Sequence, residues 1–150
     1  MLLDEYEINS STLAIIPIDE NNSKVMEEEA EYFVTKSSTN IIENSCMYFG
    51  STLAGRNEGT KNLIGGTYKL PIVIEESRDI IFFPTSSPRL NECCWISLNN
   101  LVDYEKADKY SLVRFKNGTV LNTDISIFSL ENQVLRASRL ENVLRKRKNS

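Results

Sequence analysis

Histidine is absent from the sequence, and this absence excludes several common kinds of catalytic site. Without histidine the chain cannot build a Ser-His-Asp or Cys-His nucleophile, an HExxH zinc site or a deaminase zinc site with a histidine ligand. A Ser/Lys or carboxylate pair is assembled only in space, and no particular pair stands out among the 21 acidic residues. We therefore expect no enzyme, no catalytic residue and no cofactor.

Cysteine is also scarce. The three cysteines are Cys46, Cys93 and Cys94, an odd number that contains no CxxC pair. They cannot form the fully paired set of disulfides that is typical of small secreted proteins. Adjacent cysteines seldom reach one metal ion together, so Cys93 and Cys94 are interpreted as packed strand positions and no metal site is expected.

Long apolar runs and a basic leader are missing as well. No run approaches the roughly 18 apolar residues that a membrane-spanning helix needs, and the residues that follow Leu3 are acidic rather than basic. Gly59-Thr60-Lys61 lacks the GxxxxGKS/T frame of a phosphate-binding loop. We expect a soluble, cytoplasmic protein that does not contact membranes.

What the sequence does contain is a separation of charge. Within a net charge of −4, residues 1–50 carry −8, residues 51–100 are neutral overall and residues 101–150 carry +4. The acidic total argues against indiscriminate nucleic-acid binding, but a basic face can still meet phosphates. The pattern therefore permits a polyanionic partner.

Short runs rich in apolar and β-branched residues predict strands. They cover residues 6–8, 12–18, 31–35, 70–74, 79–83 and 95–98. Residues 19–23 form a polar loop in this interpretation. The acidic run Glu27-Glu28-Glu29 favours a turn or an exposed strand edge over a helix.

The clearest local pattern is a hairpin over residues 112–123. Val113 and Phe115 alternate with Arg114 and Lys116, and Asn117-Gly118 predicts a type I′ turn. The hairpin places Arg114 and Lys116 on one face.

Two short helices are expected in the middle of the chain. Thr39 or Asn40 can cap a helix over residues 41–49, and Gly50 ends it. A second helix can begin at Ser51, although the two glycines within it each weaken it by about 1 kcal/mol relative to alanine.

The last segment has helical periodicity from Ser129 to about Arg147. One apolar stripe holds Leu130, Val134, Ala137, Leu140 and Leu144. Basic residues fall outside this stripe and face solvent. The expected class is α+β: a mainly antiparallel β-sheet with short central helices and a longer C-terminal helix, in a single domain over residues 1–150.

Arg56 has two interpretations of equal weight. It lies between Gly55 and Gly59, in a stretch too rich in glycine to serve helix stability, where a planar cation can enter a narrow DNA groove or grip phosphates. The alternative is a structural arginine that donates hydrogen bonds to loop carbonyls. The other basic residues also have an ordinary interpretation, because solvated Arg/Lys faces are common.

Seven blocks of residues, in order along the chain, add a more specific indication. They are Cys46-Met47-Tyr48-Phe49-Gly50-Ser51, Ala54-Gly55-Arg56 with Gly59-Thr60, Lys69-Leu70-Pro71-Ile72, Phe82-Phe83-Pro84-Thr85, Trp95-Ile96-Ser97, Phe115-Lys116-Asn117-Gly118 and Ser129-Leu130-Glu131-Asn132-Gln133-Val134. With these blocks the chain resembles the competence transcription factor family ComK of Gram-positive bacteria, from near Tyr6 to about Leu140.

The resemblance implies a cytoplasmic activator of genes for DNA uptake and recombination. It implies a homodimer or higher oligomer on AT-rich double-stranded DNA boxes, minor-groove contact with DNA bending, and contact with RNA polymerase. Arg and Lys side chains suit the narrow groove of A-tracts. Arg56 lies in a matching block and is the main candidate DNA contact. The other candidates, chosen from charge and location, are Lys61, Lys69, Arg114, Lys116, Arg136 and Arg139.

The end of the chain departs from the family pattern. Longer relatives continue into a tail linked to activation and to capture by the MecA adaptor for the ClpC protease, whereas this sequence ends at Ser150. We expect a short paralogue or a truncated form. The alternative function is a tail-less regulatory interaction protein that forms mixed oligomers or occupies the adaptor without productive activation.

Overall fold

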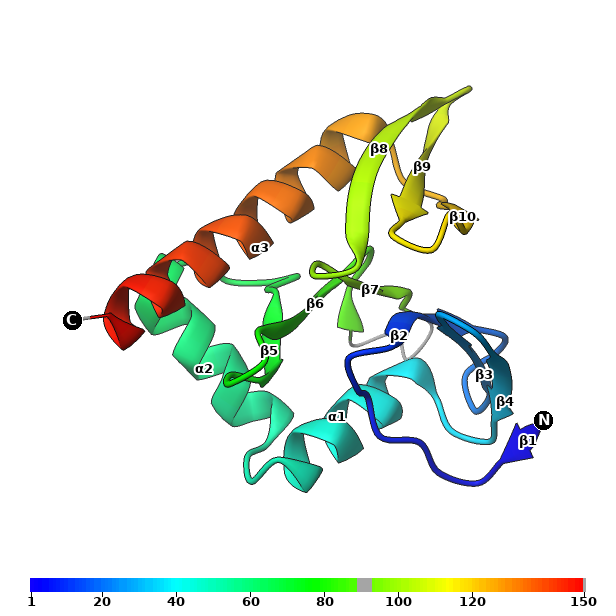
Figure 1. The fold of residues 1–150 in the computed structure, drawn as a ribbon, viewed down its shortest axis with the longest axis horizontal. Coiled ribbons are helices and arrows are strands. Elements are labelled where there is room, and N and C mark those ends of the chain that lie inside the picture. The colour runs from blue at the N-terminus through cyan, green and yellow to red at the C-terminus, as the bar shows by residue number, and fades with distance from the viewer. Residues whose placement is uncertain (89–92, 150) are drawn as a thin grey trace.

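The computed structural model describes residues 1–88 and 93–149. Figure 1 shows short strands combined with helices. The strands are β1 (Leu2–Leu3), β2 (Thr12–Pro17), β3 (Ser23–Glu27), β4 (Glu31–Val34), β5 (Ile72–Glu75), β6 (Ile80–Pro84), β7 (Trp95–Ser97), β8 (Leu101–Ala107), β9 (Tyr110–Phe115) and β10 (Val120–Asn122). The helices are α1 (Ser38–Tyr48), α2 (Leu53–Ile64) and α3 (Ile127–Lys148). Among the described residues, no helix combines the length and apolar character needed to cross a membrane.

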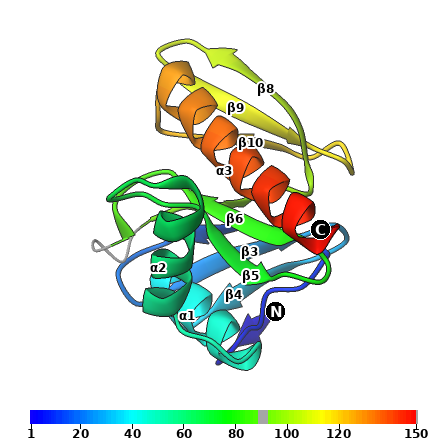
Figure 2. The ribbon, with the colours of Figure 1, turned by 90° about the vertical axis from the view of Figure 1, so that its left-hand side faces the viewer.

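Two sheets and α3 form the framework. The larger sheet has the strand order β1-β4-β3-β2-β7-β6-β5, and the smaller sheet has the order β10-β9-β8. The paired strands are antiparallel except for β1 and β4. Figure 2 shows α3 along the junction of the two sheets. This α+β architecture, with two short central helices and a longer C-terminal helix, confirms the class expected from the sequence.

Strand β6 separates two apolar cores. Ile81 and Phe83 pack in the core that α3 and the smaller sheet complete, whereas Ile80 and Phe82 pack in the core that α1 completes. Successive side chains of a strand point to opposite faces of its sheet, and here both faces are covered. The continuous apolar run of β6 follows from this double burial.

The predicted strands are largely confirmed, with several differences. Strand β1 was not predicted, and Cys93 and Cys94 lie just before β7 rather than at strand positions. Residues 6–8 are not a strand, and the Ile8 N–H instead donates to Ser45 Oγ on α1 at 3.0 Å. Strand β3 begins at Ser23, inside the expected polar loop, because it pairs with both β2 and β4. Nothing in the sequence pattern predicts β8, a polar segment that is held by its pairing with β9.

Two helices begin earlier than the sequence predicts. Ser37 caps α1 by accepting a hydrogen bond from the Asn40 N–H at 3.1 Å, and Ser126 caps α3 by accepting one from the Ser129 N–H at 3.1 Å. Asn40, one of the two predicted caps, and Ser129, where the predicted periodicity begins, are thus the residues whose N–H groups donate to the observed caps. Gly50 follows the end of α1 with a φ of +87°, as predicted.

The predicted hairpin is confirmed as β9 and β10, but the prediction of a type I′ turn between them is wrong. That turn requires positive φ at both central residues, and Gly118 has a φ of +89° whereas Asn117 is outside the left-handed region. The Gly118 N–H donates to the Phe115 carbonyl and the Phe115 N–H donates to the Thr119 carbonyl, each at 2.9 Å. This is the pattern of a turn followed by a glycine bulge.

Candidate nucleic-acid interface

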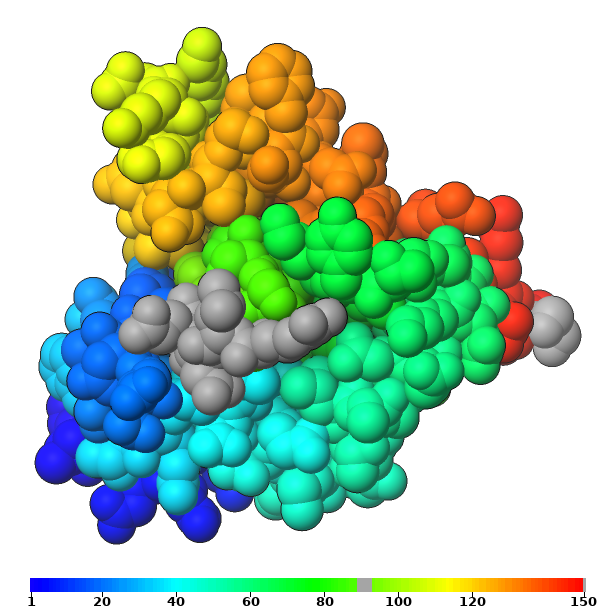
Figure 3. All heavy atoms as spheres, turned by 180° about the vertical axis from the view of Figure 1, so that it is seen from behind, coloured from blue at the N-terminus to red at the C-terminus, as the bar shows by residue number. Residues whose placement is uncertain are grey.

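The loop between α2 and β5, residues 65–71, packs against the first half of α3. Figure 3 shows this face of the molecule, where green residues of the loop meet orange residues of the helix. Gly65 and Gly66 have φ values of +79° and +101°, so the backbone turns before Tyr68. A Cβ at Gly66 would lie 2.7 Å from Leu70 Cδ2 and 3.0 Å from Arg136 Nη2. Glycine therefore allows the loop to approach α3 closely.

Arg136 and Gln133 fasten this loop to α3. Gln133 Nε2 donates to the Lys69 carbonyl at 2.9 Å and to the Pro84 carbonyl at 2.7 Å. Arg136 Nη1 donates to the Lys69 carbonyl at 3.2 Å and to Gln133 Oε1 at 2.8 Å, and Nη2 donates to the Tyr68 carbonyl at 3.1 Å. Partial burial lowers the pKa of Arg136, although a guanidinium stays charged at neutral pH. The network fixes a positive charge beside the loop.

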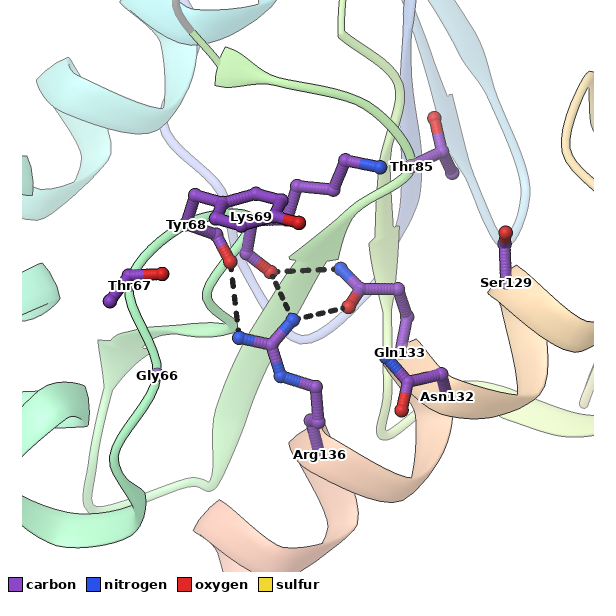
Figure 4. Close-up of a pocket in the computed structure, with 9 residues that line it drawn as sticks. All are labelled: Gly66, Thr67, Tyr68, Lys69, Thr85, Ser129, Asn132, Gln133 and Arg136. Carbon is purple, nitrogen blue, oxygen red and sulfur yellow. Dashed lines mark hydrogen bonds between the residues drawn. The ribbon is translucent and has the colours of Figure 1, made fainter.

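A surface pocket of about 410 Å³ lies against this network. Figure 4 shows the loop on one side of the pocket and α3 on the other. Its nine lining residues are Gly66, Thr67, Tyr68, Lys69, Thr85, Ser129, Asn132, Gln133 and Arg136. Two of these residues are cationic and none is acidic. We call this space the Arg136 pocket.

A second pocket, of about 330 Å³, adjoins the Arg136 pocket, because Thr67, Tyr68 and Lys69 line both. Helix α2 contributes one face to it, which includes Lys61. Lys61 Nζ lies 3.4 Å from Glu58 Oε1 in an exposed ion pair. Arg139 is exposed and follows Arg136 by three residues on α3, which places the two side chains on neighbouring turns. The structure thus gathers four predicted residues, the basic cluster: Lys61, Lys69, Arg136 and Arg139.

Arg56 lies outside the basic cluster. It belongs to α2 rather than to a glycine-rich turn, because Thr52 caps the helix by accepting a hydrogen bond from the Gly55 N–H at 2.9 Å. Burial raises the pKa of the Cys46 thiol on α1 to about 12, and the nearby charge of Arg56 opposes that rise. Arg56 Nε is buried and has no hydrogen-bond partner among the described residues. No hydrogen bond from Arg56 to a loop carbonyl is therefore seen among the described residues. The contact of Arg56 with DNA stays a prediction.

Arg114 lies on β9 of the smaller sheet and Lys116 follows that strand, and neither residue lines a pocket of the basic cluster. Arg114 Nη1 lies 2.9 Å from Asp103 Oδ1, and Nη2 lies 2.7 Å from Glu105 Oε1. Hydrogen bonds to these two carboxylates raise the pKa of Arg114. Lys116 is exposed in the turn after β9. The charge of Arg114 is therefore balanced locally.

Several residues of the site were not singled out by sequence reasoning. Tyr68, Asn132 and Gln133 are neutral, so a search for cations passes over them. An indication was nevertheless available, since Asn132 and Gln133 lie in one of the blocks that carry the family resemblance. Over residues 1–88 and 93–149, no three Cys, Asp or Glu side chains are placed to hold a metal ion together.

Comparisons with known proteins agree with this block pattern. A family model described as ComK protein matches residues 3–149. The chain is 35% identical over 141 residues to the competence transcription factor of Bacillus subtilis (strain 168), an alignment that covers 91% of this chain and 73% of that protein. No solved structure matches the chain significantly.

Proposed function

Because the chain belongs to the ComK family, whose member in Bacillus subtilis is a competence transcription factor, we propose that it activates competence genes by binding AT-rich double-stranded DNA. In this proposal residues 1–150 act as one DNA-binding domain, which oligomerises on paired boxes in the cytoplasm and contacts the minor groove. RNA polymerase, the MecA adaptor and the ClpC protease are the further partners that we propose. The family match over nearly the whole chain carries the proposal.

The basic cluster supports a role in DNA binding. Its residues come from α2, the 65–71 loop and α3, and the side chains of Lys69 and Arg139 form no ion pair with the described residues. Positive side chains that are free of carboxylates can neutralise DNA phosphates and release counterions. Phosphate contacts of this kind position a protein on DNA, while groove width and deformability select AT-rich sequence.

The test is a binding titration of the purified full chain at two salt concentrations. One duplex carries two AT-rich boxes and the other is a GC-rich duplex of equal length. We expect the protein to prefer the AT-rich duplex. The logarithm of the binding constant should fall with the logarithm of the salt concentration, with a slope of about −0.9 for each phosphate neutralised. Equal weak binding to both duplexes, or none, would contradict the proposal and leave the regulatory interaction protein as the better explanation.

A double variant, Lys61→Gln with Lys69→Gln, tests the basic cluster within the same titration. Loss of two phosphate contacts should reduce the salt slope by about 2 and weaken binding to both duplexes. Lys24→Gln, compared with each of the two single variants, is the control, because Lys24 lies on β3 outside the basic cluster and its ion-pair partner Glu31 is exposed. If the control weakens binding as much as each single variant does, the basic cluster is not the interface.

A further inference from the structure

Four of the residues that line the Arg136 pocket carry side-chain donors with no acceptor among the described residues. The side chains of Thr67, Tyr68, Lys69 and Asn132 line it, and none of them forms a hydrogen bond or ion pair with the described residues. Together they present an ammonium group, two hydroxyl groups and a carboxamide. In a chain with more acidic than basic residues, a pocket with two cations and no carboxylate favours an anion.

Arg136 gives this pocket a fixed positive charge. Its guanidinium is held by two backbone carbonyls and by Gln133 Oε1, so it does not need to be ordered when a ligand binds. The three acceptors are neutral, so the charge of Arg136 is not cancelled by an ion pair within the network. A preorganised cation of this kind lowers the entropic cost of binding an anion.

The dimensions fit an anion larger than inorganic phosphate. The volume of about 410 Å³ lies within the range of roughly 300–1,000 Å³ that is usual for small-molecule sites. Tyr68 is 66% exposed and lines the pocket. Its ring offers an apolar face on which a sugar or base can pack next to a phosphate.

We propose that the Arg136 pocket binds the phosphate group of a nucleotide, with Lys69 and Arg136 supplying charge and Asn132 and Tyr68 supplying hydrogen bonds. The phosphate comes either from the DNA backbone or from a free mononucleotide. In the first case the inference rests on the proposed function and names the place where one backbone phosphate is held. In the second case it is independent of that function.

The experiment follows amide resonances of Gly66, Thr67 and Lys69 in the ¹⁵N-labelled full chain. Titrants are deoxyadenosine monophosphate, inorganic phosphate, deoxyadenosine without phosphate, and the AT-rich duplex. Asn132→Asp places a carboxylate at the pocket with little change of shape. Asn142→Asp makes the same change on the same helix ten residues later, about 15 Å along its axis, at an exposed position outside the pocket.

We expect a phosphate-bearing titrant to shift the loop resonances while deoxyadenosine leaves them in place. Asn132→Asp should weaken that binding by about tenfold or more through charge repulsion, and Asn142→Asp by no more than about twofold. A response to the mononucleotide identifies a free phosphate ester, and a response to the duplex alone identifies the DNA backbone. Both outcomes support the inference.

Other outcomes overturn it and separate it from the proposed function. If the AT-rich duplex binds while the loop resonances stay in place, or binds while Asn132→Asp behaves like Asn142→Asp, the pocket does not hold a phosphate and the proposed function stands. If the mononucleotide shifts the loop in a protein that binds neither duplex, the inference stands and the proposed function fails.

Discussion

At the scale of single residues, Gly66 is the glycine at which an added Cβ would meet the nearest neighbour. Its φ is +101°, and an added Cβ would meet Leu70 at 2.7 Å and Arg136 at 3.0 Å. We expect Gly66→Ala to lower the free energy of unfolding by about 1–3 kcal/mol, measured by urea denaturation. Gly59→Ala is the control, because Gly59 is helical and an added Cβ there would have no neighbour within 4 Å. It should raise that free energy by about 0.5–1 kcal/mol.

A substitution at Arg136 can distinguish the structural role of this side chain from the role of its positive charge. Arg136→Lys keeps the positive charge but loses the fork that reaches two carbonyls and Gln133. We expect the free energy of unfolding to fall by about 1–2 kcal/mol, because charge-assisted hydrogen bonds at a partly buried site are lost. Arg139→Lys, at an exposed position, should change it by less than about 0.5 kcal/mol. Equal stability of the two variants in thermal melts would show that the network does not fasten the loop.

At the scale of elements, α3 is held by its apolar stripe. Leu140 is fully buried in the core beneath α3, whereas Leu135 on the same helix is 60% exposed. Leu140→Ala should lower the free energy of unfolding by about 2–5 kcal/mol, the usual cost of a cavity in a packed core. Leu135→Ala should change it by less than about 0.5 kcal/mol. Urea denaturation of both variants checks the docking, and similar losses in the two would contradict it.

The sequence predicts an element well when the interactions that form it lie within a few residues along the chain, and poorly when they join distant segments. The stripe of α3 is readable because helical spacing alone puts Leu130, Val134, Ala137, Leu140 and Leu144 on one face, and all five are buried. Strand β8 is not readable, because its segment has little apolar character and only pairing with β9 makes it a strand. The turn after β9 was placed correctly by its glycine, but its type depends on the register of the two strands.

The same contrast between local and long-range interactions applies to the site. Charge in the sequence identifies Lys61, Lys69 and Arg136 one by one, but their proximity depends on the packing of α2, the 65–71 loop and α3. The structural role of Arg136 could not be predicted either, because its side chain donates to backbone carbonyls that no sequence pattern reveals. Arg114 is similar, since its partners on β8 belong to a strand that the sequence does not predict.

At the scale of the whole molecule, the separation of charge along the chain becomes a separation in space. The first 50 residues carry −8 and form β1 to β4 and α1, whereas the net positive last third contains α3. Figure 1 places β1 to β4 away from the C-terminal half of α3. Under the proposed function, this charge distribution would turn α3 and its neighbouring loop toward DNA before contact.

The stability of the whole molecule should respond to alkaline rather than to neutral pH. No histidine titrates between pH 6 and 8. Burial raises the pKa of the Cys46 thiol to about 12 and also raises the pKa values of Cys94 and Tyr6. These groups keep their protons longer in the folded than in the unfolded protein. Their contribution is therefore complete below the unfolded pKa values and is lost as pH rises toward the folded ones.

We accordingly expect a nearly constant free energy of unfolding from pH 6 to 8 and a fall between about pH 9 and 11. Each buried thiol should contribute up to about 1.4 kcal/mol per pH unit once the pH exceeds its unfolded pKa, and Tyr6 should add to the fall only above about pH 10. Urea denaturation in the presence of a reductant measures it. Cys46→Ala removes one titrating thiol, so the alkaline slope should become shallower by about that amount even if the variant is less stable at every pH. An unchanged slope in Cys46→Ala would show that this thiol does not control alkaline stability, because a cavity alone alters the level of the curve and leaves its slope as it was.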